Sequence, residues 1–267
     1  MILNNRTPIL LFILISCFIN TTVLTAQKLY DITWKKEGVI LSSAIGLTLG
    51  GQYIGGQKTP ISETNLFALD PNSINGFDRN TIDNFSESNA LKSDLFKDGI
   101  WVVPISLFLS NQGRENMIEI IIMYSEVFSL NYGITNITKN ALGRYRPYAY
   151  NPEVSLDLKL SPTTRRSFFS GHVSHVASLS FFTATVFDDL YPESDFRYVV
   201  WAGAIAAPAI TGYLRVKAGR HFPTDVVVGY GVGALVGYFI PELHKITKDS
   251  NVNIIGVDGG LGIVYSF

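Results

Sequence analysis

The chain has 267 residues, of which 47% are hydrophobic and 16% are charged, and its formal net charge is -1. This composition supplies one buried core, and the near-neutral charge argues against a nucleic-acid-binding protein, which normally carries a basic stripe. The single cysteine, Cys17, lies in an N-terminal apolar run, so the rest of the chain offers no disulfide, thiol nucleophile or cysteine metal site.

The first 26 residues have the pattern of an export signal. Arg6 supplies positive charge, residues 9–19 are almost wholly apolar, and Ala26 is a small residue before a cleavage point. Two alternatives stay open, since Ser16 before Cys17 suits a lipidation site and the run also suits an uncleaved membrane anchor. Each alternative places the remaining chain outside the cytoplasm or on a membrane.

Six apolar segments follow and predict an all-α fold, a helical bundle of about six core helices. They cover residues 38–56, 99–109, 117–137, 172–187, 198–214 and 224–240. Several are shorter than the roughly 20 apolar residues of a membrane span. Glu119 and Glu126, two turns apart on one helical face, favour a helix that faces protein or water.

Small residues recur every four positions in two of these segments, a spacing that predicts close approach of helix backbones. The two sets are Gly203, Ala207 and Thr211, and Gly229, Gly233 and Gly237.

Two further regions differ in composition. Residues 57–97 are polar and rich in turn residues, which predicts a long surface insertion, either a lid or a solvated connector with a short helix near residues 90–96. Residues 253–267 alternate around Asp258-Gly259-Gly260 and predict a β-hairpin. The expected organisation is a signal peptide (1–26), an N-terminal helix with the insertion (27–98), a helical core (99–245) and a tail (246–267).

Three polar segments lie at the ends of predicted helices. The first, residues 139–147, carries Lys139, Arg144 and Arg146. A lysine offers a point charge, and an arginine offers a planar fork that clasps two phosphate oxygens. By itself such a basic cluster is also typical of an ordinary helix C-terminus.

The second segment, Ser170-Gly171-His172, opens a helix. Ser170 is placed to cap the helix, and Gly171 lets a ligand approach amides that attract anions. His172 is placed to give a proton to a leaving oxygen. Taken alone, this tripeptide is equally an ordinary cap followed by a surface histidine.

The third segment contains Arg215, His221 and Asp225. Asp225 lies one turn into a helix that begins at Pro223, so its carboxylate reaches back towards the imidazole of His221 and fixes the tautomer. A histidine held in this way is a competent nucleophile at phosphorus, although the same pair also occurs for structural reasons.

The order and spacing of the three segments resemble the type 2 phosphatidic acid phosphatase (PAP2) and vanadium haloperoxidase superfamily. The matching patterns are Lys-x6-Arg-Pro from Lys139, Ser-Gly-His from Ser170 and Arg-x5-His-x3-Asp from Arg215, within residues 100 to 240. Phe169 and Leu214 stand where the family has proline and serine, which affects loop geometry and substrate preference.

The resemblance implies a phosphate site. Lys139, Arg146 and Arg215 would bind the phosphate oxygens, together with the Ser170 hydroxyl and the Gly171 amide.

The resemblance also implies the catalytic roles. His221 would attack phosphorus and form a phosphohistidine, Asp225 would orient it, and His172 would protonate the leaving alcohol and then activate water. No metal or other cofactor is expected, and vanadate would act as an inhibitor.

The expected activity is therefore a metal-independent phosphatase of phosphomonoesters or diphosphates, acting on lipid or polyprenyl carriers. One alternative is a vanadium-dependent haloperoxidase, in which vanadate is the prosthetic group, and another is a non-catalytic envelope protein that retains the fold.

The expected location is the periplasm or cell envelope, with peripheral or integral membrane contact. After cleavage of the signal, three full crossings would carry Lys139 to the inner side, which is inconsistent with an exported phosphatase site. We therefore expect partial or peripheral contact rather than complete insertion.

Overall fold

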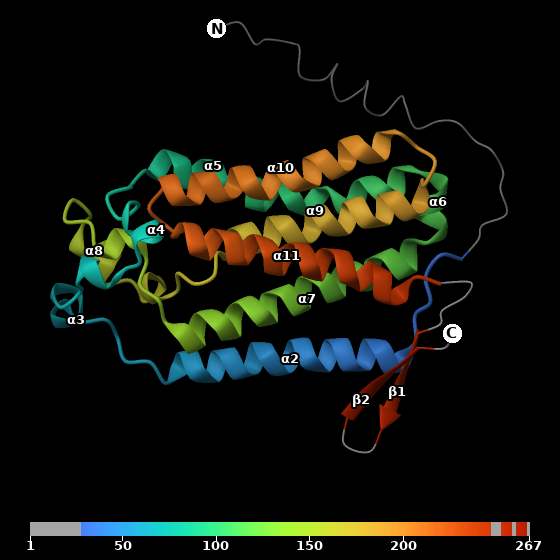
Figure 1. Ribbon diagram of the computed structural model, residues 1–267, viewed down its shortest axis with the longest axis horizontal. Helices are drawn as coiled ribbons and strands as arrows, with labels where there is room; N and C mark the ends of the chain where they lie inside the picture. Colours follow the sequence, from blue (N-terminus) through green and yellow to red (C-terminus); the bar gives the residue numbers. More distant parts are fainter. Residues whose placement is uncertain (1–27, 247–251, 258–259, 266–267) are drawn as a thin grey trace, which may run out of the picture.

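The structure is a computed structural model that describes residues 28–246, 252–257 and 260–265. Long helices run side by side along its length (Figure 1). They are α2 (Trp34–Gly56), α7 (Met117–Leu142), α9 (Gly171–Leu190), α10 (Phe196–Lys217) and α11 (Pro223–His244). The shorter α5 (Glu87–Gly99) packs on α9 and α10 and completes the bundle. The predicted all-α bundle of about six core helices is confirmed.

Five of the six apolar segments correspond to long helices, but residues 99–109 do not. There the chain forms two 3-10 helices, η2 (Ile100–Val102) and η3 (Pro104–Leu109). Pro104 has no amide hydrogen to continue an α-helix, and its ring restricts the preceding residue. The sixth core helix is α5, which comes from the end of the polar insertion.

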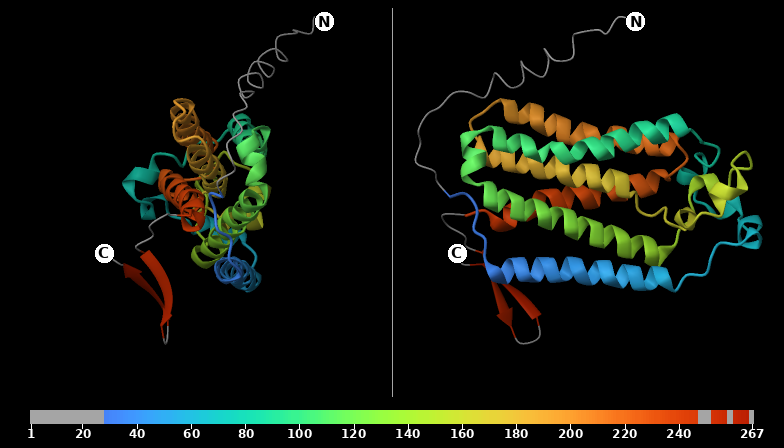
Figure 2. Two further views of the ribbon diagram at one scale, coloured as in Figure 1. Left: turned by 90° about the vertical axis from the view of Figure 1, so that its right-hand side faces the viewer. Right: turned by 180° about the vertical axis from the view of Figure 1, so that it is seen from behind.

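Helix α9 forms the centre of the bundle and packs against α5, α7, α10 and α11 (Figure 2). The contact with α11 is close because of its glycines. A Cβ added at Gly233 would lie 2.2 Å from the carbonyl oxygen of Ser174, and one at Gly237 would lie 2.2 Å from that of Ser178. The predicted close approach is therefore found on α11. On α10, by contrast, a Cβ at Gly203 would meet no described atom within 4 Å.

Most of the short elements gather at one end of the bundle (Figure 1). They are α3 (Glu63–Phe67), η1 (Pro71–Ser73), α4 (Gly76–Arg79), η4 (Pro147–Ala149), α8 (Leu156–Lys159) and η5 (Pro162–Arg165), whereas α6 (Asn111–Glu115) lies at the other end.

The beginning of the described chain lies at the end of the bundle where α11 finishes. The Asp31 N–H donates to the carbonyl oxygen of His244 at 2.7 Å, and Tyr30 bridges to Lys245. Residues at the start of α2 and at the end of α11 are therefore neighbours.

The predicted hairpin is present. β1 (Val252–Val257) pairs antiparallel with β2 (Gly260–Tyr265), and Val257 pairs with Gly260 next to the expected turn. The predicted signal peptide and the lipidation candidate Cys17 lie outside the described residues.

Four helical segments are long and apolar enough to cross a membrane: α2, the stretch from Met117 to Ala149 that includes α7, α10 and α11. Their surfaces expose large apolar side chains, for example Ile45 and Leu49 on α2 and Phe239 on α11. In membrane proteins, apolar side chains exposed on such helices are covered by lipid. The chain is a membrane protein. As predicted, Glu126 does not face lipid, because it is fully buried inside the bundle.

Candidate active site

His221 and Asp225 meet at the N-terminus of α11. The Nδ1 atom of His221 lies 3.5 Å from Oδ2 of Asp225, and both side chains are buried. The Asp225 carboxylate also accepts hydrogen bonds from the Ser167 hydroxyl and, at 2.9 Å, from the Phe222 N–H. A carboxylate fixed in this way directs Nδ1 of the imidazole towards itself and leaves Nε2 for a ligand.

His221 is a neutral imidazole in this setting. Burial, and then the positive charges of Arg146, Lys139 and Arg215, lower the pKa of His221 well below its ordinary value. An unprotonated nitrogen retains the lone pair that a nucleophile needs.

Ser170 is the N-cap residue of α9, but the prediction that its side chain caps the helix is wrong. Its backbone N–H donates to the Asp225 carbonyl oxygen at 2.9 Å. The hydroxyl is fully buried and has no hydrogen-bond partner among the described residues. This hydroxyl is therefore available to a bound ligand.

The adjacent Gly171 gives the site its close packing. A Cβ there would lie 3.4 Å from Cε of Lys139 and 3.3 Å from Cγ2 of Thr135. The absence of a side chain at Gly171 thus lets the lysine stem lie close to the start of α9.

Two cations at the site are held by main-chain oxygens. Nζ of Lys139 donates to the carbonyl oxygen of Arg166 at 2.7 Å, and Nε of Arg146 donates to that of Thr163 at 3.0 Å. Neither cation forms an ion pair within the described part of the chain. Their charges are therefore available to an anion.

His172 and Arg215 are joined by a residue that the sequence did not single out. Oδ1 of Asp94, on α5, lies 2.7 Å from Nε2 of His172 and 3.4 Å from a terminal nitrogen of Arg215. Arg215 also donates to the Ser93 hydroxyl at 3.1 Å. No local motif marks Asp94, because its partners lie 78 and 121 residues further along the chain.

Arg144 belongs to the first basic segment but, unlike Lys139 and Arg146, it forms ion pairs with carboxylates. Its guanidinium bridges Oδ2 of Asp78 at 2.8 Å and Oδ1 of Asp225 at 2.7 Å, and it lies 4.2 Å from the centre of the Phe222 ring. Asp78 in turn accepts the Thr224 N–H at 3.0 Å. Arg144 thus links the polar insertion to the start of α11.

The insertion therefore contributes to the site and is more than the solvated connector expected for residues 57–97, while the short helix expected near residues 90–96 is present as α5. Asp78 on α4 and Asp94 on α5 both come from it. The sequence around both residues has the composition of a surface loop, so only the tertiary structure shows their contacts.

A cavity of about 460 Å³ opens beside these groups. Five predicted site residues line it: Lys139, Arg146, Gly171, His172 and His221. The other three do not line it: Asp225 lies beside His221, Ser170 precedes Gly171, and Arg215 shares Asp94 with His172.

Aromatic side chains form another wall of the same cavity. Trp101, Phe128, Tyr132 and His175 line it, and the Trp101 ring centre lies 4.9 Å from that of Phe128 and 4.6 Å from that of His175. The cavity thus combines a cationic floor with an apolar wall, an arrangement suited to an amphipathic anion.

Known proteins share parts of this sequence. A sequence model of the PAP2 superfamily matches residues 121–248. Lipid A 4'-phosphatase of Porphyromonas gingivalis is 30% identical over 81 residues, which cover 30% of this chain and 31% of that protein. Lipid A 1-phosphatase of Rhizobium johnstonii is 30% identical over 159 residues, which cover 52% of this chain and 60% of that protein. The chain thus spans less than two thirds of either relative.

Among solved structures, the chain is similar to the first transmembrane PAP2 type phosphatidylglycerolphosphate phosphatase from Bacillus subtilis. The TM-score is 0.43 at 18% sequence identity, over 88% of this chain and 92% of that one.

Proposed function

We propose that the protein is a phosphatase of lipid-linked phosphate esters of the PAP2 type, because residues 121–248 match the PAP2 superfamily model. One observation carries the proposal. Two imidazoles, His172 and His221, share a cavity with Lys139 and Arg146, and aromatic rings form another wall of that cavity.

The cationic floor binds the phosphoryl group. Within the described part of the chain, neither Lys139 nor Arg146 forms an ion pair with a carboxylate, and the buried Nε of Arg215 has no hydrogen-bond partner. Together with the free Ser170 hydroxyl, they supply donors for several phosphate oxygens. In phosphoryl transfer, such positioning and charge neutralisation provide most of the rate.

The first step transfers the phosphoryl group to His221. Its Nε2 attacks phosphorus, the new N–P bond forms, and the bond from phosphorus to the leaving oxygen breaks. His172 gives its proton to that oxygen, so the alcohol leaves neutral. Asp225 stabilises the positive charge that develops on the His221 ring.

The second step releases phosphate. His172 takes a proton from a water molecule, the water oxygen attacks phosphorus, and the N–P bond breaks to regenerate neutral His221. Asp94, whose Oδ1 lies 2.7 Å from Nε2 of His172, holds the ring in place during this exchange. We propose that both steps proceed without a metal at this site.

The substrate class follows from the aromatic wall and the membrane. Trp101, Phe128 and Tyr132 suit the apolar part of a lipid or polyprenyl phosphate rather than a small soluble ester. Two relatives carry the name lipid A phosphatase, and we propose a lipid-linked phosphate presented at an exported membrane face.

The test is a phosphate-release panel over lipid A, phosphatidate, polyprenyl diphosphate and a soluble ester, in the presence of a chelator. We expect release from one or more lipid substrates, with loss of at least about 10³-fold in His221→Ala. Acid-labile phosphoenzyme should form in the wild type and be absent in His221→Ala. Bromide oxidation with vanadate and peroxide, without phosphate release, would instead identify a haloperoxidase.

A further inference from the structure

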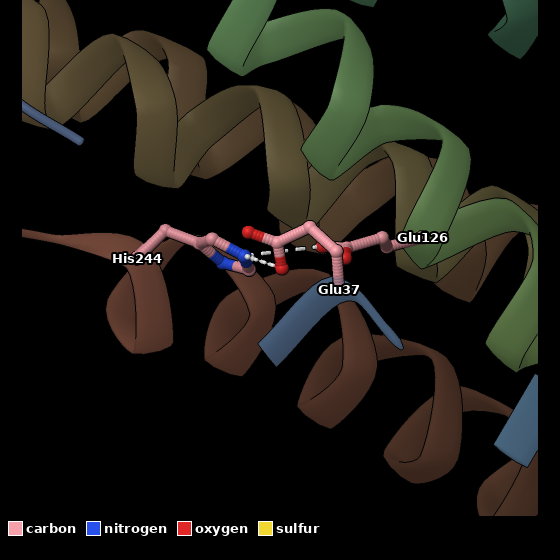
Figure 3. Close-up of side chains that lie close together, drawn as sticks. All are labelled: Glu37, Glu126 and His244. Carbon is pink, nitrogen blue, oxygen red and sulfur yellow. Dashed lines mark hydrogen bonds and ion pairs between the residues drawn. The ribbon is translucent and has the colours of Figure 1, made fainter. Parts of the chain in front are cut away.

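Figure 3 shows a second cluster of ionisable side chains, which lies where α11 ends, whereas the active site lies where α11 begins. Glu37 comes from α2, Glu126 from α7 and His244 from the last turn of α11. One ligand atom from each lies within 4.8 Å of the others. The side chains of all three are buried, and Glu126 and His244 are 0% exposed. None of the three lines the catalytic cavity.

The hydrogen bonds of His244 determine which of its nitrogens faces the carboxylates without a proton. Nδ1 lies 2.7 Å from the carbonyl oxygen of Ile240. A carbonyl oxygen only accepts, so the proton of the neutral ring is on Nδ1. The lone pair of Nε2 then points towards Glu37 and Glu126, as Figure 3 shows.

The two carboxyl groups have few hydrogen-bond partners outside the cluster. One oxygen of Glu37 accepts the Thr33 N–H at 2.8 Å. Neither oxygen of Glu126 accepts a hydrogen bond from any described residue, although both are buried. Oxygen and nitrogen atoms from three side chains thus converge on one point, an arrangement that is costly in a buried site unless a proton or a metal ion lies between them.

The distances fit a metal ion better than a protonated histidine. Nε2 of His244 lies 3.4 Å from Oε2 of Glu37 and 3.3 Å from Oε2 of Glu126. Charge-assisted N–H···O bonds from an imidazolium would be about 2.7–2.9 Å long. Metal bonds of about 2.0–2.2 Å at tetrahedral angles put neighbouring ligand atoms about 3.3–3.6 Å apart.

We propose that Glu37, Glu126 and His244 bind one divalent transition-metal ion, with Zn²⁺ the first candidate. One imidazole and two carboxylates match its ligand preferences. The bond from Nδ1 of His244 to the Ile240 carbonyl is the outer contact that typically orients a ligating histidine. Because the three ligands lie on three helices, the ion joins the start of α2, the middle of α7 and the end of α11.

Metal content tests the proposal directly on the full chain, purified in detergent without a histidine tag. We expect about one Zn²⁺ per chain after growth with added zinc. Glu126→Gln should reduce this at least tenfold. Glu119→Gln is the matched control, since Glu119 lies two turns away on α7 and pairs with Lys28 instead, and it should keep the ion. Wild-type protein with less than about 0.1 ion per chain would overturn the proposal.

Two measurements on the wild type avoid dependence on a variant that fails to fold. Replacement by Co²⁺ should give the visible absorption of a four-coordinate site, and its absence would contradict the proposed ligand set. A chelator should lower the Tm, and Zn²⁺ should restore it. A Tm unaffected by both treatments would contradict the metal proposal and indicate that a proton within the cluster balances its charge instead.

Measurements of phosphate release show whether a failure concerns the metal proposal or the proposed phosphatase function. Metal-free protein held below its lowered Tm should keep its phosphatase activity within about twofold, because the ion joins helices and does not touch the cavity. Loss of activity in metal-free protein that is still folded would contradict that structural role. If His221→Ala left activity unchanged, the phosphatase mechanism would fail and the metal proposal would stand.

Discussion

Asp78 is the carboxylate through which the polar insertion holds the start of α11, and Asp78→Asn tests that link. The side chain is fully buried. It accepts the Thr224 N–H at 3.0 Å, the Thr224 hydroxyl at 2.6 Å and an Arg144 nitrogen at 2.8 Å. Asparagine keeps the shape and one acceptor but removes the charge.

The expected loss of stability follows from these bonds. Hydrogen bonds to a buried charge contribute about 1.5–3 kcal/mol each, and the loss is partial because one oxygen remains. The Arg144 side chain is 26% exposed, so water compensates part of its loss. We expect the free energy of unfolding to fall by about 2–3 kcal/mol.

Asp78→Asn should also lower the catalytic rate, because Arg144 contacts both Asp78 and Asp225. With one carboxylate gone, Arg144 no longer anchors Asp225 from a fixed position, and the orientation of His221 loosens. We expect kcat to fall by about 10–100-fold, which corresponds to about 1.4–2.7 kcal/mol. KM should change little, because Lys139 and Arg146 do not contact Asp78.

The assay combines phosphate release with denaturant unfolding in detergent. Asp70→Asn is the matched control: Asp70 is exposed in the same insertion and accepts the Asn72 N–H at 2.8 Å, a cap that asparagine also forms. If Asp78→Asn matched Asp70→Asn in both kcat and stability, the insertion would have no positioning role.

Three further predictions follow from single contacts. The pKa of Asp78 is lowered, because hydrogen bonds from Thr224 and Arg144 outweigh the effect of burial. The ionised carboxylate therefore stabilises the folded protein above about pH 4, and this contribution is lost as the pH falls further. Unfolding curves of the wild type and of Asp78→Asn should then converge in acid. Ser170→Ala should raise KM several-fold and leave the Tm unchanged, since the hydroxyl has no partner among the described residues. Gly233→Ala should lower the Tm, because its Cβ would lie 2.2 Å from a carbonyl oxygen of α9, whereas Gly231→Ala, with no described atom within 4 Å of the added Cβ, should keep or raise it.

The sequence predicted those parts of the molecule that depend on local pattern. Apolar runs located α2, α7, α9, α10 and α11, because a long apolar segment forms a helix whether it packs against protein or faces lipid. Spacing within one segment also placed His221 next to Asp225, since four residues at a helix start form one turn.

Contacts between distant segments could not be predicted in this way. Asp78 and Asp94 lie in a polar stretch whose composition is that of any surface loop, and their roles depend on Arg144, His172 and Arg215. The cluster of Glu37, Glu126 and His244 could not be predicted either, since its members lie far apart in the chain. At Ser170 the local pattern was misleading, because a serine at this position suits a helix cap but its hydroxyl forms no cap hydrogen bond.

The direction of α11 connects the membrane to the site. This helix begins beside His221 and ends at His244, whose carbonyl oxygen accepts the Asp31 N–H. If α11 crosses the bilayer, Asp31 and the catalytic cavity face opposite sides. A cleaved export signal places Asp31 outside the cytoplasmic membrane. In that case the catalytic cavity also faces outside only if the bundle is not fully inserted. Full insertion with an exported site requires Asp31 in the cytoplasm, and hence no cleaved export signal in residues 1–26. Labelling of a single cysteine at position 28 from outside the cell separates these two arrangements, because only the first leaves it accessible.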